Sequence, residues 1–314
     1  MDLILDANNL EYRSFWIGKT FGKKNPKEAE EIEISEDGEK KPGFGGIYIF
    51  LGTLRKLVEE FRPERVWACW DKKLIWPSSN FRKDMLKGEY KATRDNEAAF
   101  SEMYSQEDLL IEVLKVLGCI NMHPRVLEAD DVISWLSRKA PADNMVVSTD
   151  NDLYQLISER TSFYNLNKKS VICLANFESE IGIEPEHFVK WKSIQGDKSD
   201  NISGLKGFGK KKAAKLARAW DTEAAKLSPE QQELVDRNIT VIDLSKSWEM
   251  EDGEEDFYDL QFEDARCQQD LSVFKGICEK MNFQRFLKNF DKWVRPFKSL
   301  TEAPQPLEVE DDLL

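Results

Sequence analysis

The chain has 314 residues, enough for one large domain or two domains of ordinary size. Its apolar fraction of 41% suits a packed core, and no apolar run reaches the roughly eighteen residues of a membrane span. The first residues lack the basic start and the cleavage site of a signal peptide. Five scattered cysteines are typical of reduced thiols, so we expect a cytoplasmic protein without membrane contact, zinc finger or disulfide scaffold.

The formal net charge of −13 argues against a uniformly basic surface. Acidic residues concentrate in segments 28–39 and 249–264 and in the C-terminal tail, whereas basic residues concentrate in segments 82–94 and 206–218. The second basic segment contains six basic residues and no acid. Two local basic patches on an acidic chain are compatible with contacts to phosphate groups.

Three short apolar runs in the first half of the chain each lead into aspartate. They are residues 3–5 before Asp6, residues 66–70 before Asp71, and residues 145–148 before Asp150 and Asp152. Short continuous runs that are rich in β-branched or aromatic residues predict buried strands.

Segments with helical spacing lie between these runs, at 46–61, 104–117 and 129–139. Strands that alternate with helices predict an α/β fold with a mostly parallel central sheet flanked by helices. Ligands of such sheets bind beyond the carboxyl ends of the strands, which is where the four strand-end aspartates fall. The pattern of residues 239–244 predicts an extra strand or an extended segment.

Five more acidic residues could join these aspartates: Glu128, Asp130, Asp131, Asp197 and Asp200. Hard dications such as Mg²⁺ and Mn²⁺ need oxygen ligands, and two such ions about 3.5–4 Å apart hydrolyse phosphodiesters. Crowded carboxylates raise one another's pKa unless cations lie among them. Because His123 and His187 are the only histidines, a histidine-based mechanism is disfavoured.

Each acidic group also has a structural explanation. Asp130 and Asp131 could cap a helix and stabilise its dipole, and Asp150 could cap the next helix. Asp71 could be a turn residue, and the 197–200 pair could be solvated. The joint occurrence of these acids at strand ends favours a metal site.

The order of several motifs resembles the 5′-nuclease, or flap endonuclease, superfamily. That superfamily includes phage 5′–3′ exonucleases, phage ribonuclease H and the 5′-nuclease domain of bacterial DNA polymerase I. The matching motifs are Asp6 in LDANN, Phe81-Arg82 with Tyr90 to Arg94, Glu128 to Asp131, Ser148 to Leu156, Gly196 to Ile202, and Gly204 to Gly209. The resemblance covers roughly residues 1 to 245.

The resemblance implies two bound Mg²⁺ or Mn²⁺ ions. One ion would lie mainly among Asp71, Glu128, Asp130 and Asp131, and the other mainly among Asp150, Asp152, Asp197 and Asp200. Asp6 would orient waters at the first ion. Lys91 and Arg94 would be catalytic, because cations on the scissile phosphate stabilise the charge that builds on its oxygens.

The resemblance also implies a helical arch over residues 72–105 through which a single strand passes. Bases would stack on Phe81 or Tyr90 while cations such as Arg82 follow the backbone. The alternative for this segment is a solvated amphipathic helix.

The second basic segment resembles a helix–hairpin–helix within residues 195–220. Its glycines would let backbone N–H groups approach a phosphate, and its lysines would neutralise phosphates. The residues concerned are Gly204, Gly207, Gly209, Lys210, Lys211 and Lys212. Family members often hold K⁺ here through backbone carbonyls.

We therefore predict a nuclease core with its arch over residues 1–184 and a helical DNA-binding region over 185–300. Residues 301–314 form an acidic, disordered tail that could dock on replication proteins. Two departures from the family are a charged insertion at residues 21–41, expected to be a loop, and the acidic segment around 251–264.

The predicted function is that of a monomeric, structure-specific 5′ nuclease in a bacterial or phage-infected cytoplasm. It would hydrolyse DNA with a 5′ flap or 5′ end, or an RNA–DNA hybrid, during primer or flap removal in replication. Two alternatives stay open. A non-catalytic scaffold that grips branched DNA would be expected to have lost several acids or Lys91. A PIN-type ribonuclease usually lacks the helix–hairpin–helix and uses fewer acids.

Overall fold

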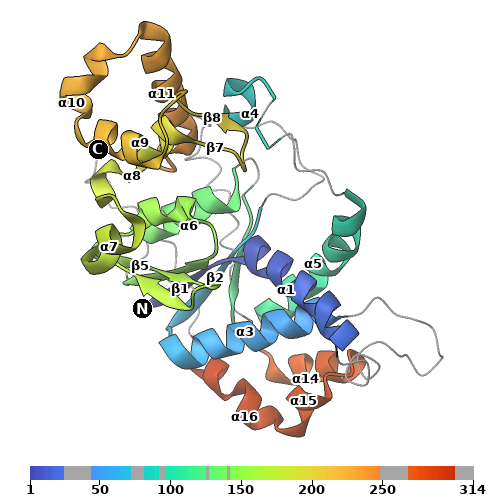
Figure 1. Cartoon of the computed structure of the whole chain (residues 1–314). Helices are drawn as coiled ribbons and strands as arrows, with labels where there is room; N and C mark the ends of the chain where they lie inside the picture. Colours follow the sequence, from blue (N-terminus) through green and yellow to red (C-terminus); the bar gives the residue numbers. More distant parts are fainter. Residues whose placement is uncertain are drawn as a thin grey trace.

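A six-stranded sheet forms the centre of the molecule, and helices cover both of its faces (Figure 1). This computed structural model describes residues 1–24, 44–71, 81–88, 90–91, 97–124, 127–139, 142–247 and 268–300. The strands, in the order β3-β2-β1-β4-β5-β6, are β1 (Asp2–Asp6), β2 (Arg65–Cys69), β3 (Ile120–Met122), β4 (Asn144–Ser148), β5 (Thr161–Asn165) and β6 (Ser170–Ile172). Strands β3, β2, β1, β4 and β5 are parallel to one another, and the edge strand β6 pairs with β5 in the antiparallel direction.

The three strands predicted from sequence are confirmed as β1, β2 and β4. All residues of these three strands are buried, because a parallel sheet covered by helices excludes water from both faces. β1 lies between β2 and β4, so the carboxyl ends of the three strands are adjacent.

One face of the sheet carries Leu3, Leu5 and the helices that pack on them. These helices are α1 (Ala7–Lys24), α3 (Gly45–Phe61), α5 (Glu97–Leu117), α14 (Leu271–Lys280), α15 (Gln284–Lys288), α16 (Phe290–Val294) and η5 (Arg295–Ser299). No helix in the described part of the chain is long and apolar enough to cross a membrane.

The other face carries Ile4, Trp67 and Val146 and a second group of helices. They are α6 (Ala129–Lys139), η1 (Asp152–Leu156), η2 (Leu174–Asn176), α7 (Phe177–Ile181), η3 (Pro185–His187), α8 (Phe188–Gln195), α9 (Lys210–Arg218), α10 (Trp220–Glu223), η4 (Ala224–Lys226) and α11 (Pro229–Ile242). A two-stranded hairpin of β7 (Gly196–Asp197) and β8 (Ile202–Ser203) follows α8, and the short α4 (Phe81–Met85) lies beside it.

Residues 239–242 are the last turn of α11, so the possible strand at 239–244 is wrong. Ser228 and Gln231 form a capping box, and Pro229 occupies the first turn, so the helix start is strongly specified. At the other end Val241 and Ile242 pack against Tyr90. Tertiary packing therefore overrides the strand preference of this β-branched run.

Residues 268–300 pack on the predicted nuclease core rather than with the predicted DNA-binding region. Phe274, Phe286 and Phe297 are buried in the same cluster as the α3 and α5 side chains. The Arg55 Nε also donates a hydrogen bond of 3.0 Å to the Trp293 carbonyl. Residues 21–24 of the predicted loop belong to α1, and the rest of that insertion, residues 25–41, lies outside the described residues.

The crossing of α1 and α3 predicts a stability difference between two glycines. A Cβ on Gly18 would lie 2.6 Å from the Gly45 carbonyl carbon, and two helix backbones cannot separate cheaply. We expect Gly18→Ala to lower the free energy of unfolding by about 1–3 kcal/mol in urea denaturation. Gly52→Ala on α3, whose Cβ meets nothing within 4 Å, should instead stabilise the protein by about 1 kcal/mol. Equal effects at both positions would contradict the close crossing.

Candidate active site

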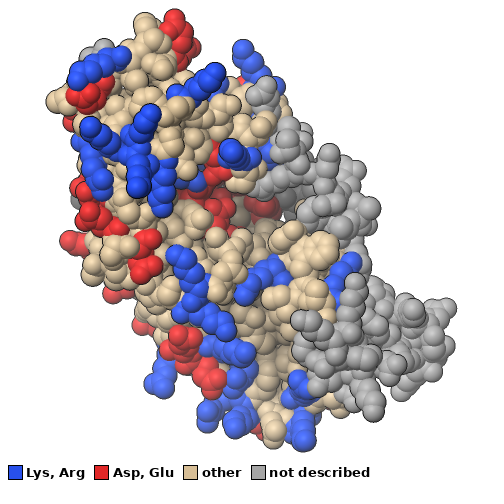
Figure 2. Space-filling model, viewed as in Figure 1, with Lys and Arg blue, Asp and Glu red and all other residues tan. Residues whose placement is uncertain are grey.

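The strand-end aspartates gather at one edge of the sheet. Asp6 ends β1, Asp71 follows β2, and Asp150 and Asp152 follow β4. Figure 2 shows acidic side chains in a hollow near the middle of this face, with Lys and Arg on the surface around it. The parallel order of the three strands therefore produces the convergence that the sequence predicts.

Asp6 is buried at the base of this group. It accepts hydrogen bonds from the Ser148 hydroxyl at 2.6 Å and from the Asn9 backbone N–H at 3.1 Å. Burial, together with the smaller effects of the Asp150 and Asp71 charges, raises the pKa of Asp6 to about 7 although these hydrogen bonds lower it. A cation beside Asp6 would remove this penalty on its charged form.

Asp130 is a second buried carboxyl group that interacts with Asp6 and Asp150. Burial raises the pKa of its carboxyl well above the usual range, and Asp150 and Asp6 raise it further. Asp71 lies close to the same helix start, since its Oδ1 accepts a hydrogen bond of 3.0 Å from the Ala129 N–H. Asp6, Asp130 and Asp150 therefore form a mutually repelling group of carboxylates.

Glu128 is held by the predicted catalytic lysine. Its Oε2 accepts hydrogen bonds from the Lys91 Nζ at 2.9 Å and from the Tyr90 hydroxyl at 3.0 Å. Burial opposes ionisation of Glu128, but the charges of Lys91 and Arg82 lower its pKa to about 2. The Lys91 N–H also donates to the Asp200 carbonyl at 3.2 Å, so this lysine lies between two of the predicted metal ligands.

Asp152 and Asp197 share one partner, Lys192, which lies outside the motifs that predict the site. The Lys192 Nζ lies 2.6 Å from an oxygen of each carboxylate. Burial opposes ionisation of Asp197, but its bonds to Lys192 and to Ser199 lower its pKa. The available signal was a lysine five residues before Asp197, in a helix whose buried residues include Phe188, Trp191 and Ile194.

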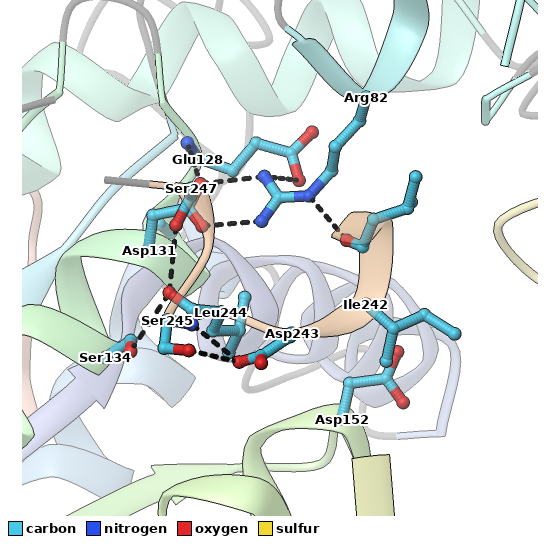
Figure 3. A network of polar contacts seen from close by, with 12 residues as sticks. Arg82, Glu128, Asp131, Ser134, Asp152, Ile242, Asp243, Leu244, Ser245 and Ser247 are labelled. Carbon is cyan, nitrogen blue, oxygen red and sulfur yellow. Dashed lines mark hydrogen bonds and ion pairs between the residues drawn. The ribbon is translucent and has the colours of Figure 1, made fainter. Parts of the chain in front are cut away.

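Asp131 and Arg82 have a structural role that differs from the one predicted. Asp131 is fully buried, and its oxygens accept hydrogen bonds of 2.8 and 2.6 Å from the Arg82 guanidinium. Arg82, at 2% exposure, also donates from Nε to the Val241 carbonyl at 3.0 Å. Because both side chains are satisfied and buried, neither is presented to a metal or to nucleic acid here (Figure 3).

The same network ties the end of α11 to the start of α6. Residues 243–247 run beside α6, where the Ser134 hydroxyl donates to the Leu244 carbonyl at 3.4 Å (Figure 3). Gln155 accepts from the Leu244 N–H at 2.9 Å and donates to the Ile242 carbonyl at 3.1 Å. The acidic site and residues 229–247 are therefore parts of one packed unit.

Phe81 and Tyr90 are each 5% exposed, so they do not form the exposed stacking surface that the sequence predicts. Tyr90 packs with Ile202 and Val241, and the Phe81 ring lies 4.7 Å below the Arg82 guanidinium carbon. Residues 72–80, 89 and 92–96 of the predicted arch lie outside the described residues. Arg94 lies outside the described residues, as do the acidic segment 249–264 and the tail 301–314.

The hairpin glycines divide into two groups. A Cβ on Gly204 would lie 2.0 Å from the Gln195 carbonyl oxygen, so Gly204 serves the packing of β7 and β8 rather than a phosphate. Gly207 has a φ of +87°, and a Cβ on Gly207 or Gly209 would meet nothing within 4 Å. These two glycines therefore border open space before α9.

Lys210, Lys211 and Lys212 are exposed in the first turn of α9. Positive charge is unfavourable at a helix N-terminus, where the dipole and the free N–H groups attract anions. The three lysines and the free N–H groups of this turn therefore create a positive electrostatic potential, which a bound phosphate would neutralise.

No group of three His, Cys, Asp or Glu side chains in the described ranges is arranged to hold a metal ion as it stands. Basic residues are instead paired with Glu128, Asp131, Asp152 and Asp197. The donor set nevertheless fits a hard dication, because it consists of carboxylates, several of which repel one another.

Solved structures share this architecture. The flap endonuclease of bacteriophage T5, in a complex with DNA and metal ions, aligns with a TM-score of 0.64 and 20% identity over 84% of this chain and 97% of that one. Flap endonuclease-1 from Methanococcus jannaschii aligns with a TM-score of 0.52 and 14% identity, over 95% of this chain and 90% of that one. The fold is therefore that of the 5′ nucleases, as predicted.

Sequence comparison identifies the family. The family described as 5'-3' exonuclease, N-terminal resolvase-like domain, matches residues 2–182. The 5'-3' exonuclease of Bacillus subtilis is 34% identical over 78% of this chain and 80% of its own length. The thermostable DNA polymerase I of Thermus aquaticus is 28% identical over 97% of this chain, which corresponds to 34% of the polymerase. The chain belongs to the 5′-3′ exonuclease family and is a structure-specific 5′ nuclease.

Proposed function

We propose that this nuclease hydrolyses phosphodiesters with two divalent metal ions held by the carboxylates at the strand ends. The observation that carries the proposal is the burial of Asp6 and Asp130 near Asp150: burial is the main cause that raises the pKa of both carboxyl groups, and the charge of Asp150 acts in the same direction. Carboxylates placed so closely favour a multivalent cation over protons at neutral pH. Mg²⁺ and Mn²⁺ are the ions that an all-oxygen donor set of this kind prefers.

The first ion would be held mainly by Asp71, Glu128 and Asp130, with Asp6 orienting its waters. The second would be held mainly by Asp150, Asp152, Asp197 and Asp200. Asp131 would contribute indirectly, since its oxygens bind Arg82 and the Glu128 N–H at 3.0 Å. When bound, such ions supply hydroxide and stabilise the leaving oxygen.

The chain's own cations would act on the phosphate. Lys91 lies at the edge of the carboxylate group with its Nζ on Glu128, 22% of its side chain being exposed. A phosphate that enters the site would replace Glu128 as the partner of the Lys91 ammonium. The ammonium would then stabilise the charge that develops on the phosphoryl oxygens. Arg94 would assist from the predicted arch.

The substrate would be DNA with a 5′ end or a 5′ flap, the duplex part of which rests on the hairpin and on α9. The T5 neighbour is a complex with DNA, which supports a DNA substrate. RNA–DNA hybrids, K⁺ at the hairpin and docking of replication proteins on the tail are further parts of this proposal. No observation favours the scaffold or the PIN-type alternative.

A 5′-flap duplex labelled at either end tests the proposal directly. With Mg²⁺ or Mn²⁺ we expect short 5′ products that carry 3′-hydroxyl ends, and with EDTA we expect none. Cleavage that persists in EDTA after removal of bound metal would rule out the two-metal mechanism. Products released only from the 3′ end would rule out the polarity.

The exposed lysines of α9 give a salt-dependent prediction. If Lys211 neutralises one duplex phosphate, Lys211→Ala should flatten the plot of log affinity against log salt by up to about 0.9. Lys226→Ala, which removes a 69% exposed lysine that pairs with Glu223, is the matched control and should leave the slope unchanged. The measurement is fluorescence anisotropy with flap duplexes over a salt series in EDTA.

A second substrate separates binding from folding in this prediction. Cleavage of a short single strand should be unaffected by Lys211→Ala, because that substrate does not reach α9. Equal losses on single-stranded and duplex-bearing DNA would instead assign the helix to support of the fold. Gly207→Val is a poorer test, because the φ of +87° strains any side chain at that position.

A further inference from the structure

The ammonium of Lys192 bridges two of the proposed metal ligands, Asp152 and Asp197. Its Nζ is 2.6 Å from the Asp152 Oδ1 and 2.6 Å from the Asp197 Oδ2. The three side chains are only 13–20% exposed, so water screens the contact poorly. Lys192 belongs to α8, Asp152 to η1 and Asp197 to β7, so one ammonium joins three separate elements.

The ammonium and a metal ion cannot use these two oxygens together. A Mg²⁺ ion binds carboxylate oxygens at about 2.0–2.1 Å, inside the space that the Lys192 Nζ occupies. Two positive charges at such separations also repel strongly where the site is partly buried. Lysine carries its charge on a flexible four-carbon stem, so withdrawal of the ammonium is mechanically simple.

We propose that Lys192 is the resident counter-ion of Asp152 and Asp197, and that a divalent ion bound by these carboxylates displaces it. This inference rests on the proposed two-metal function. Lys192 is thus a positioning residue: it holds η1 and the β7 hairpin together before metal arrives. It also sets the metal affinity of the second site, because each metal ion must exchange with a bound ammonium.

The test uses Mn²⁺ alone, without DNA, and isothermal titration calorimetry on the full chain. Lys192→Met keeps most of the apolar stem and removes the charge. We expect one Mn²⁺ to bind at least roughly tenfold more tightly than in wild type, equivalent to about 1.4 kcal/mol. In EDTA the same variant should unfold at a lower temperature, because two facing carboxylates lose their partner.

Lys190→Met is the matched control, because it removes the same charge from the same helix. The Lys190 Nζ lies 5.1 Å from the centre of the Trp220 ring rather than on the carboxylates. We expect its Mn²⁺ affinities to stay within about twofold of wild type. A general loss of positive charge would tighten Mn²⁺ binding equally in both variants, and that result would overturn the proposal.

A measurement on the wild-type chain keeps the proposal testable if Lys192→Met does not fold. Acetylation of Lys192 by an activated ester, followed by peptide mass spectrometry, should increase at saturating Mn²⁺ while acetylation of Lys190 stays constant. Unchanged labelling of Lys192 at saturating Mn²⁺ would contradict displacement.

The outcomes separate this inference from the function on which it rests. If wild type binds Mn²⁺ and cleaves flaps but Lys192→Met has equal or weaker affinity, only the counter-ion role fails. If wild type binds no Mn²⁺ and its cleavage is indifferent to EDTA, the two-metal function fails and the counter-ion role with it.

Discussion

Asp150→Asn is expected to abolish cleavage of a 5′-flap duplex in Mg²⁺ while DNA binding stays close to that of wild type. Asp150 is the carboxylate whose charge acts on Asp6, on Asp130 and on Asp152. Its charge therefore acts on carboxylates of both proposed metal positions, and its loss should weaken metal binding at both. Asparagine keeps the oxygen that accepts the Asp152 N–H at 2.8 Å, so the local turn should survive.

The change in the stability of the metal-free protein on Asp150→Asn shows whether Asp150 serves the site or the fold. Removal of a charge that repels its neighbours should leave the metal-free protein as stable as wild type or more stable. Asp143→Asn is the control, because it removes the same charge from a side chain that is 76% exposed. The ion pair of Asp143 with Arg160 is long, at 3.9 Å, so its loss should have little effect. Retention of cleavage by Asp150→Asn within about tenfold, roughly 1.4 kcal/mol of barrier, would reject the assignment.

The central sheet could be predicted because its information is local. Each of β1, β2 and β4 is a continuous apolar run, and a parallel sheet requires burial on both faces of every strand. The position of the aspartates follows from the strand ends alone. The convergence of Asp6, Asp71 and Asp150 therefore needs only the order of three adjacent strands, which the α/β pattern favours.

The partners of the basic residues could not be predicted, because they are distant in sequence. The basic segment around Arg82 predicts a phosphate-binding residue. The Arg82 guanidinium instead binds Asp131, 49 positions away. Lys192 likewise binds Asp152, a residue of a different element. Composition shows that a cation is present, but only the fold shows whether an acid of the same chain already neutralises it.

The side of the sheet on which a helix packs is a second property that the sequence does not reveal. The apolar stripe of α14 contains Phe274 and Cys278, which would suit either face equally. The structure places it against α5 and α3. The β-branched end of α11 shows the related ambiguity of short apolar runs, where Val241 and Ile242 fit a strand or a helix until their neighbours are known.

Lys91→Met is expected to lower kcat for flap cleavage by at least about a hundredfold with little change in KM. The reason is that a cation on the reacting phosphate stabilises charge that exists only in the transition state, as an oxyanion donor does. Lys91 has a φ of 53°, and its Nζ lies 2.9 Å from Glu128 at the edge of the carboxylate group. Methionine keeps the stem of the side chain and loses only the charge.

Lys87→Met is the matched control, since Lys87 has a φ of 50° in the same segment but an exposed side chain. Any cost of a changed side chain in left-handed backbone should be the same in both variants, so it cancels in their comparison. The measurement is single-turnover cleavage over a range of enzyme concentrations, which separates binding from the chemical step. A loss confined to binding would make Lys91 a substrate-binding residue. A loss shared equally by Lys87→Met would attribute the effect to the backbone of this segment rather than to a charge on the phosphate.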